Sequence, residues 1–391
     1  MGGFANMRAL RYATRGGRVL QVMPVRTARA QRAFVRLPER LYADDPCFVT
    51  PLRLERRMQL GPHNPYFRHA RWERFVAWRD GRPVGRISAQ VDALYEQTHG
   101  VRAGHFGVLD AHDDPGTVAA LLDAAAAWLR GQGCTLMRGP FNLSINEECG
   151  LLVHGFDTPP AVLMGHGPAY LPAHVEAAGL RAVKELIAYR VDLDYAEPAA
   201  SRRLLADLGP RLTDRPFDRR NWRADVTTLR TLFNAAWADN WDFAPFIEAE
   251  FNALGPLVRF IVPPGQVRIA SLDGTPVGMI AALPNLNEFT ADLHGRLHPW
   301  NAVRLVWRVL RRTPAGARVA LMGIAPDLQK SALGAAVAFL MIRNTRAALV
   351  ANGYRWVEMS WILEDNKGMR RIIEALGSDP YKRYRIYERA L

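Results

Sequence analysis

One segment of this chain concentrates side chains that could hold a reacting molecule and take a proton from it. Residues 138–150 follow an apolar stretch and read Arg-Gly-Pro-Phe-Asn-Leu-Ser-Ile-Asn-Glu-Glu-Cys-Gly. A carboxylate within hydrogen-bond reach of an acidic proton can act as a general base. The candidate catalytic residues are Glu147, Glu148, Asn142 and Asn146, and Ser144 is a candidate for substrate binding. A structural turn, in which the Asn and Ser side chains bind their own backbone, is the alternative.

A second segment has the composition of an anion-binding turn. Residues 318–324 predict a β-strand, the small residues of 325–334 predict a loop, and the Ala-rich run 335–350 predicts a helix. Such a loop points unpaired N–H groups and the positive end of a helix dipole at one place. The alternative is a tight strand-to-helix turn without a ligand. The candidate binding residues are Gly323, Ile324, Ala325, Gln329, Ala332, Leu333, Gly334 and Ala335.

Two further segments combine polar and aromatic groups. Residues 237–246 contain two Trp, two Phe and two Asp, which could line an apolar pocket or form a core corner at a helix end. Residues 164–170 place an imidazole in a Gly/Pro-rich loop, where it could act as a base or lie on the surface. The candidate substrate-binding residues here are Asn240, Trp241, His166 and Tyr170.

The elements that must position these residues occur twice along the chain. The hexamer 80–85 (Asp-Gly-Arg-Pro-Val-Gly) is echoed at 273–278 (Asp-Gly-Thr-Pro-Val-Gly), and both lie between apolar runs. An Asp-Gly step between two such runs predicts a tight β-hairpin, because glycine readily adopts the positive φ of the turn. Glu-Ala-Ala-Gly at 176–179 is echoed by Glu-Ala-Leu-Gly at 374–377, with Lys and Tyr following at equal spacings.

Two ordered matches predict that one whole domain has been duplicated, rather than an array of small repeats. The length of 391 residues and the 49% share of apolar residues are sufficient for two cores. We expect domains at 19–197 and 198–391. Residues 1–18 form a basic tail whose order the sequence leaves open.

In its second half the chain resembles the GNAT superfamily of acyl-CoA-dependent N-acyltransferases. The pyrophosphate loop of that family reads Gln/Arg-x-x-Gly-x-Gly/Ala, and this chain has Gln329-x-x-Ala332-x-Gly334. The segment 366–377 resembles the second motif of the family. The resemblance implies an α/β (α+β) fold of two tandem domains, each with a mixed, largely antiparallel central sheet flanked by helices. It also implies that acyl-CoA is a co-substrate, held by the loop around Gly334 and by Asn366.

Two residues depart from the family pattern, and the first copy departs further. Ala332 replaces a loop glycine, and Ile373 stands where the family usually has a Tyr that acts as the acid. The equivalent loop of the first copy, 106–116, is acidic and is expected to repel anions. Its Asp and His residues are typical of a helix N-cap and first turn, and we expect no metal site. We therefore expect the second domain to bind the cofactor and the first to shape the acceptor site.

The net charge of +13 is unevenly distributed. Residues 1–36 hold eight Arg and no acidic residue, and 302–318 hold five Arg and no acidic residue. Such patches favour anionic partners, including CoA phosphates, an acidic acyl carrier protein and an anionic lipid surface. The basic, amphipathic helix expected at 302–312 could contact membrane or present a solvated face. Since neither an apolar run long enough to span a bilayer nor a secretion signal is evident, we expect a cytoplasmic location, with peripheral contact at the inner face of the membrane.

From about residue 20 onward the chain resembles the bacterial ceramide synthase-like group of tandem GNAT proteins. The resemblance rests on 142–147, on Asn240-Trp241 and on the helix led by Asn366. It implies transfer of a long-chain acyl group from acyl-CoA or acyl carrier protein to a lipid amine, a sphingoid base. Two alternatives stay open: a non-catalytic acyl-CoA-binding or partner-binding protein, and a Fem-like transferase that uses aminoacyl-tRNA. A nucleic-acid partner is disfavoured, because no stacking-aromatic motif accompanies the basic patches.

Overall fold

The computed structural model describes residues 10–13 and 19–391, which form two compact units. The first unit contains the described residues up to Glu185, together with Leu293–Leu297 and Tyr384–Leu391; the second contains Leu186–Asp292 and His298–Arg383. The boundary expected at residue 197 concerns the repeats along the sequence and stays a prediction. The basic tail expected at 1–18 lies outside the described residues, except for Leu10–Ala13.

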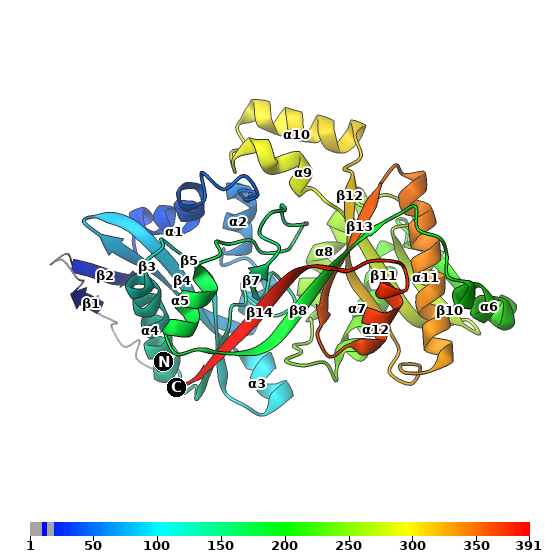
Figure 1. Cartoon of the computed structure of the whole chain (residues 1–391), viewed down its shortest axis with the longest axis horizontal. Helices are drawn as coiled ribbons and strands as arrows, with labels where there is room; N and C mark the ends of the chain where they lie inside the picture. The colour runs from blue at the N-terminus through cyan, green and yellow to red at the C-terminus, as the bar shows by residue number, and fades with distance from the viewer. Residues whose placement is uncertain (1–9, 14–18) are drawn as a thin grey trace. The chain divides into compact units, whose positions relative to one another are not determined.

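The first unit is built on one mixed sheet, in which only β5 and β6 are parallel (Figure 1). The neighbouring strands follow the order β1-β2-β3-β4-β5-β6-β14. Its strands are β1 (Leu10–Ala13), β2 (Val19–Pro24), β3 (Ala70–Arg79), β4 (Arg82–Asp92), β5 (Ala103–Ala111), β6 (Leu136–Gly139), β7 (Leu151–His154) and the end of β14 (Pro380–Ala390). Its helices are α1 (Ala28–Leu41), α2 (Arg53–Gln59), α3 (Ala93–His99), α4 (Pro115–Gly131) and α5 (Leu171–Ala177), with a 3₁₀ turn at Pro65–Arg68.

The second unit repeats this plan in the order β8-β13-β12-β11-β10-β9, again with a single parallel pair, β12 and β13. Its strands are the end of β8 (Arg181–Asp192), β9 (Leu212–Pro216), β10 (Val267–Leu272), β11 (Thr275–Pro284), β12 (Gly316–Ile324), β13 (Trp356–Leu363) and the start of β14. Its helices are α6 (Ala199–Leu208), α7 (Trp222–Trp237), α8 (Glu248–Phe260), α9 (Asn287–Thr290), α10 (Pro299–Arg311), α11 (Ala332–Ala351) and α12 (Lys367–Glu374), with 3₁₀ turns at Gly209–Arg211 and Ala291–Leu293. Mixed, largely antiparallel strands flanked by helices in each unit confirm the expected fold class.

Both predicted hairpins form, and they use the same turn. Arg79 pairs with Arg82 in the first unit, and Leu272 pairs with Thr275 in the second, so each loop contains only the Asp-Gly step. The φ angles of Asp80 and Gly81 are 49° and 72°, and the equivalent pair in the second unit has 48° and 81°. Positive φ at both positions matches the right-handed twist of the flanking strands.

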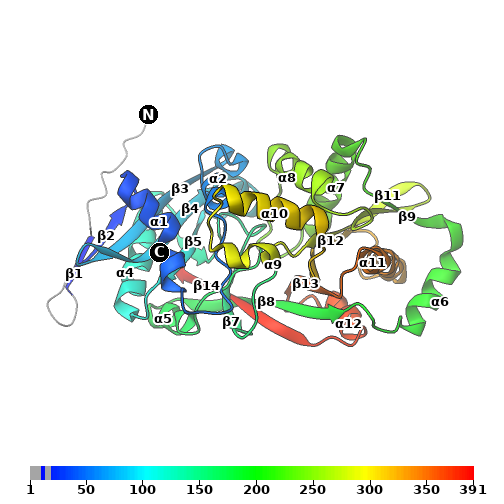
Figure 2. The same ribbon diagram turned by 90° about the horizontal axis from the view of Figure 1, so that it is seen from above.

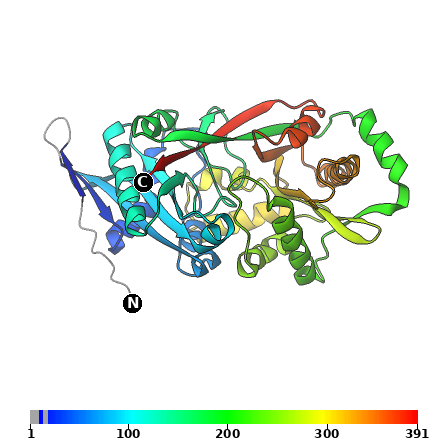
Figure 3. The ribbon, with the colours of Figure 1, turned by 90° about the horizontal axis from the view of Figure 1, so that it is seen from below.

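The helices that cover the two sheets begin and end at residues suited to those positions. Asp114 caps α4 by accepting hydrogen bonds from Gly116 N and Thr117 N, as the acidic first-copy loop predicts. Ser331 caps α11, which Figure 3 shows end-on in dark orange. Its side chains Ala336, Val337 and Met341 are fully buried in the second-unit core. Among the described residues α11 is long and apolar enough to cross a bilayer, but half of that stretch is buried within the unit, where it packs on β10 and β11.

The closing strands of the two repeats are exchanged between the units. The end of β8, which closes the first repeat in sequence, pairs with β13 in the second unit, and the end of β14 pairs with β6 in the first. The exchange also makes the Tyr of each repeat the partner of the echoing Glu of the other repeat. Tyr189 OH donates to Glu374 Oε1 at 3.0 Å in the second unit, and Tyr387 OH donates to Glu176 Oε1 at 3.0 Å in the first.

One face of β4 carries a row of buried polar side chains: Arg86, Ser88, Gln90 and Asp92. The period of two in a strand places them on the same side of the sheet. The Gln90 Nε2 donates to Phe141 O at 2.7 Å and to Leu143 O at 3.1 Å. This row therefore anchors the polar loop 140–149 to the sheet.

Replacing Gln90 should weaken that anchor. A Gln90→Leu variant keeps the size of the side chain but leaves the carbonyls of Phe141 and Leu143 without this buried donor, which costs about 1–3 kcal/mol. Urea unfolding measures the loss of stability. Gln97→Leu on exposed α3 is the matched control and should leave the unfolding curve within experimental error. Equal stability of the Gln90 variant and the wild-type protein would contradict the anchoring role.

Candidate functional site

The parallel strands β12 and β13 separate from one another partway along their length. Their pairing runs from Gly316↔Trp356 to Val319↔Met359. Beyond these residues the two strands, both fully described, no longer pair. β12 stays bonded to β11 as far as Ile324, and β13 keeps the pairing with β8 that begins at Trp356, with a shift of register between Met359 and Ile362. The separation leaves a strand edge of β12 open within the second unit.

A cleft of ≈ 770 Å³ opens at this separation, and all of its lining residues belong to the second unit. It combines residues of β12 and β13, the end of α7, the 325–334 loop with the start of α11, and the start of α12. Six of the predicted cofactor-binding residues line it: Gly323, Ile324, Gln329, Gly334, Ala335 and Asn366. Ala325, Ala332 and Leu333 are not among the lining residues described, although they lie on the same loop and helix start.

The backbone of β12 decides which amide faces the cleft. Ala325 N donates to Val277 O at 2.8 Å, so this N–H is turned toward β11. Peptide groups alternate in direction along a strand, so Ile324 points the opposite way, toward the open edge. Its carbonyl agrees with this direction, since Gln329 Nε2 donates to Ile324 O at 3.0 Å. The N–H of Ile324, and not that of Ala325, is available to a group in the cleft.

The loop before α11 is shaped by close packing of its backbone. Ser331 Oγ accepts from Gly334 N at 3.0 Å and caps the helix. A Cβ at Gly334 would lie 2.2 Å from Leu328 O, so only glycine fits without a shift of the loop. The Gln329 side chain also donates to Ala236 O at 2.9 Å, which assigns it to shaping the loop. The first N–H groups of an α-helix have no partner within the helix itself, and at α11 the Ser331 hydroxyl takes up that of Gly334. The exposed Lys330 lies directly before this helix start.

Asn240 and Trp241, predicted as substrate-binding residues, line the same cleft. Asn366 lines it too, and its side chain caps α12 by accepting from Met369 N at 3.1 Å. Sequence analysis did not single out several other lining residues: Asp239, Lys330, Ser360, Trp361, Asp365 and Lys367. Their proximity depends on the path of β13 and α12. The composition did contain one signal, since lysine is rare in this Arg-rich chain and two of its four lysines line the cleft.

A buried polar network lies behind Ser360. Arg318 Nε donates to Ser360 Oγ at 2.8 Å, and the Ser360 hydroxyl donates in turn to Glu358 Oε1. Glu358 is completely buried and also accepts a hydrogen bond from Tyr381 OH. A buried carboxylate needs such partners to remain charged, and here they fix Ser360 at the wall of the cleft.

In the first unit the equivalent opening is filled by the chain itself. The parallel pairing of β5 and β6 ends at His105↔Arg138, and the following loop covers the edge of β5. Phe141 N donates to Phe106 O at 2.7 Å, and Val108 N donates to Asn142 Oδ1 at 2.7 Å. A Cβ at Gly107 would lie 1.8 Å from Phe141 O, which shows how closely the loop lies against the strand. The first unit therefore has no open edge of this kind among its described strands.

The predicted catalytic side chains lie on this loop and are held by polar contacts. Both oxygens of Glu148 accept from Arg56 Nη2, at 2.7 and 2.9 Å, and Asn142 Nδ2 donates to Glu148 Oε2 at 2.8 Å. Burial disfavours the charged form of Arg56, but the Glu148 carboxylate outweighs it and raises the pKa of the guanidinium. Glu147 accepts a hydrogen bond from the neutral amide of Gln59.

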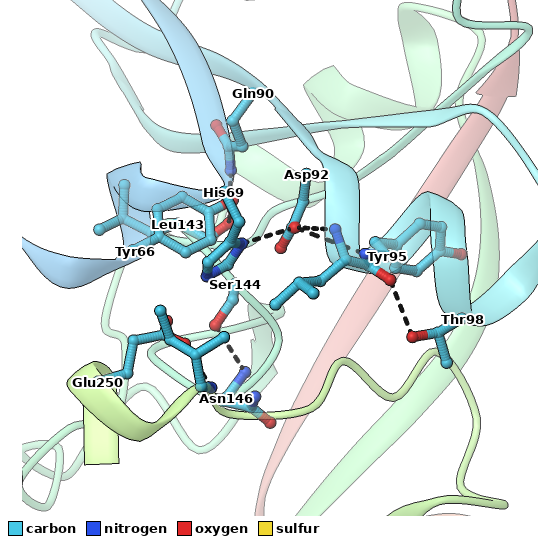
Figure 4. A network of polar contacts seen from close by, with 12 residues as sticks. Tyr66, His69, Gln90, Asp92, Tyr95, Thr98, Leu143, Ser144, Asn146 and Glu250 are labelled. Carbon is cyan, nitrogen blue, oxygen red and sulfur yellow. Dashed lines mark hydrogen bonds and ion pairs between the residues drawn. The ribbon is translucent and has the colours of Figure 1, made fainter. Parts of the chain in front are cut away.

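Ser144 and Asn146 contact each other on the same loop, since Asn146 N donates to Ser144 Oγ at 3.2 Å (Figure 4). Tyr66 OH donates to Leu143 O at 3.0 Å and fixes the loop from the other side. Figure 4 also shows His69, whose Nδ1 lies 2.8 Å from Asp92 Oδ1. The structure thus gathers the five predicted loop residues, and it shows both self-bonded turn contacts and contacts to the surrounding elements.

His166 and Tyr170 lie elsewhere in the first unit and do not contact the loop through the bonds described. His166 Nε2 lies 2.9 Å from Asp45 Oδ2, and only 2% of the imidazole is exposed. Tyr170 OH donates to Ala111 O at 2.7 Å. Burial and the charges of Asp113 and Asp110 raise the pKa of Tyr170 to about 12. At neutral pH this phenol is a hydrogen-bond donor and not a base.

The first unit contains two other polar clusters that the sequence analysis described, one acidic and one basic. The acidic residues of 106–116 serve as partners of Arg86, Arg79 and His174, and no group of described residues could hold a metal ion. The basic residues of α1 contribute to an arginine-lined cavity of ≈ 740 Å³ in which Glu39 is the one acidic lining residue described. The arginines that line it are Arg29, Arg32, Arg36, Arg40, Arg53, Arg82 and Arg296.

No protein-family model matches the chain, but known proteins resemble it over nearly its whole length. The chain is 44% identical to the bacterial ceramide synthase of Caulobacter vibrioides (strain NA1000 / CB15N) over 375 residues, 95% of this chain and 98% of that protein. It is 41% identical to Protein YghO of Escherichia coli (strain K12) over 363 residues, 92% and 93% of the two chains.

Solved structures give the fold independently of close sequence identity. A tandem GNAT protein from the clavulanic acid biosynthesis pathway matches with a TM-score of 0.56 at 15% identity, covering 95% of this chain and 98% of that one. The GNAT fold generally uses acyl-CoA and an amine acceptor. With 44% identity over nearly its whole length, the chain belongs to the same family as the bacterial ceramide synthase, and it has the fold of tandem GNAT proteins.

Proposed function

We propose that this protein transfers a long-chain acyl group from acyl-CoA to the amino group of a sphingoid base, forming a (dihydro)ceramide. The observation that carries the proposal is the separation of β12 from β13 beside the N-terminus of α11. An open strand edge can bind an extended, amide-bearing cofactor arm, and a helix N-terminus can bind its pyrophosphate. The name of the 44% identical relative supports the lipid amine as acceptor.

Each part of the donor matches a part of the second-unit cleft. The pyrophosphate is assigned to the start of α11 at Gly334, with Lys330 and Lys367 as nearby cations. The thioester carbonyl is assigned to the N–H of Ile324, one of the predicted binding residues. The apolar lining, which includes Met322, suits an acyl chain. An acyl carrier protein presenting the same thioester arm is the second possible donor.

The reaction breaks a thioester and forms an amide. The acceptor ammonium loses a proton to a base, the amine attacks the carbonyl carbon, and the oxygen takes negative charge that the Ile324 N–H stabilises. Collapse of this intermediate releases the CoA thiolate, and the nitrogen gives up its second excess proton to this thiolate to leave the amide and the CoA thiol. A thiol has a pKa of about 8.5, so the thiolate is a good leaving group without a strong acid. This is consistent with fully buried Ile373 at the position of the usual Tyr.

We infer that Glu147 is the base and that Glu148 orients the loop. Both oxygens of Glu148 accept from Arg56, and Oε2 also accepts from Asn142, so this carboxylate is already engaged in holding the loop. Glu147 accepts a hydrogen bond from the Gln59 amide, and it is our candidate for the base. Asn142 supports Glu148, and Ser144 and Asn146 are assigned to the acceptor. Asp239, a carboxylate of the second-unit cleft, is the competing candidate.

The first test concerns the pyrophosphate site. Gly334→Ala should lower the affinity for CoA and palmitoyl-CoA at least tenfold, because its Cβ displaces the loop from Leu328 O. Native mass spectrometry or calorimetry measures the affinity. Gly116→Ala, at the start of α4, is the matched control: its Cβ would meet only the Asp114 side chain at 3.6 Å and should change nothing.

A charge reversal guards against the case in which Gly334→Ala fails to fold. Lys330 is exposed, so Lys330→Glu should fold normally and weaken CoA binding in a salt-dependent manner. Wild-type affinity in both variants would refute the assignment of the pyrophosphate to α11. Tight binding of palmitoyl-CoA without amide formation from any sphingoid base would instead support the non-catalytic alternative.

The second test separates the candidate bases. Glu147→Gln should lower kcat about 10²-fold or more while leaving the Kd of palmitoyl-CoA unchanged, measured with a saturating sphingoid base. Glu148→Gln should also weaken the loop, which limited proteolysis would reveal. If Glu147→Gln retains full activity and Asp239→Asn loses it, the base lies in the second unit and our assignment is wrong.

A further inference from the structure

Helix α10 of the second unit exposes a continuous apolar face. Trp300, Val303, Trp307 and Leu310 are spaced for one stripe of an α-helix, with Val306 beside them. Their exposed fractions are 72%, 62%, 49% and 74%, and that of Val306 is 57%. None of the residues of α10 is buried. A stripe of this size on a described helix marks an interaction surface.

The opposite side of α10 holds the helix in place. Arg308 Nη1 donates to Phe289 O at 2.6 Å and to Asp292 Oδ1 at 2.6 Å, and Arg304 pairs with the same carboxylate. These bonds tie α10 to α9 and the following 3₁₀ turn, which lie next to it in Figure 2. The polar side therefore faces its own unit, and the apolar stripe faces away from this contact.

We propose that α10 is an interfacial helix that inserts its apolar stripe among the headgroups of an anionic bilayer. Tryptophan is enriched at that depth, because its indole is apolar over most of its surface and carries one N–H donor. Arg311 and Arg312 are exposed at the end of the helix, and 302–318 contains no acidic residue. A basic helix with an apolar face is the pattern of a membrane-surface helix. The inference rests on the proposed lipid acceptor and names the surface from which it would be drawn.

Charge favours a bilayer over a second copy of this chain. Pairing α10 with α10 would bring two Arg-rich segments together without an acidic residue in 302–318 to offset them. An anionic lipid surface supplies phosphate groups to Arg311 and Arg312, while Trp300 and Leu310 insert between the headgroups as far as their boundary with the acyl chains. One surface thus satisfies both halves of the helix.

Co-sedimentation with vesicles tests this proposal. The full chain should bind vesicles of phosphatidylcholine with 30 mol% phosphatidylglycerol and bind pure phosphatidylcholine at least tenfold more weakly. Trp300→Ser combined with Leu310→Ser should lower binding to the anionic vesicles about tenfold or more. Arg311→Gln combined with Arg312→Gln should lower it and reduce its dependence on salt.

Two control variants separate α10 from other surfaces. Phe260→Ser removes a side chain on α8 that is 70% exposed, and it should bind vesicles like the wild-type protein. Arg32→Gln combined with Arg36→Gln lowers the charge of the arginine-lined cavity of the first unit, and it should retain most binding. Loss of binding in this last variant, with full binding of the α10 variants, would overturn the proposal.

The readout is independent of catalysis. Palmitoyl-CoA affinity should be unchanged in all α10 variants, so a failure of the proposed function would appear in the CoA and turnover assays and not in sedimentation. If the α10 variants bind vesicles normally but change the mass of the protein in gel filtration, the stripe packs against a second copy. If they lose affinity only for an acyl carrier protein, that protein is the partner. Either result would refute membrane insertion.

Discussion

The functional architecture depends on how far one pair of parallel strands stays together. Backbone N–H and C=O groups require partners, so an edge that opens in mid-sheet must be satisfied by chain, water or ligand. In the second unit β12 and β13 pair with each other over four residue pairs. Beyond these, β12 remains paired only with β11, and β13 only with β8. The open edge, the start of α11 and the start of α12 consequently meet around one cleft.

The same constraint produces the opposite result in the first unit. There the loop 140–149 covers the open edge. Gln90 of β4 and Tyr66 of the 3₁₀ turn hold the loop backbone, and Arg56 of α2 holds Glu148. Those anchors are buried or charge-assisted bonds, which are the kinds that resist displacement. One fold thus supports an open cofactor-type cleft in one copy and a fixed polar loop in the other.

Much of the site could be predicted from the sequence because its parts are local. The strand, loop and helix around Gly334 are contiguous, and so are the polar groups of 142–148. Ser360 and Trp361 were missed because their position depends on separate elements that meet only in the fold. Ala325 was predicted as a binding residue because composition does not reveal which way a peptide group points, and its bond to Val277 turns its N–H away from the open edge. The roles of Glu147 and Glu148 remain predictions, distinguished by contacts no spacing could reveal.

By itself, the sequence determined the duplication, the two Asp-Gly hairpins, the capped helices and the basic character of α10. Each depends on residue type within a few positions, where φ preference and helical periodicity act directly. Only the tertiary structure decided that the closing strands are exchanged, that the first-unit edge is filled, and that the apolar stripe of α10 remains uncovered. Strand partners and exposed faces depend on contacts between residues distant in the chain, and local pattern does not specify them.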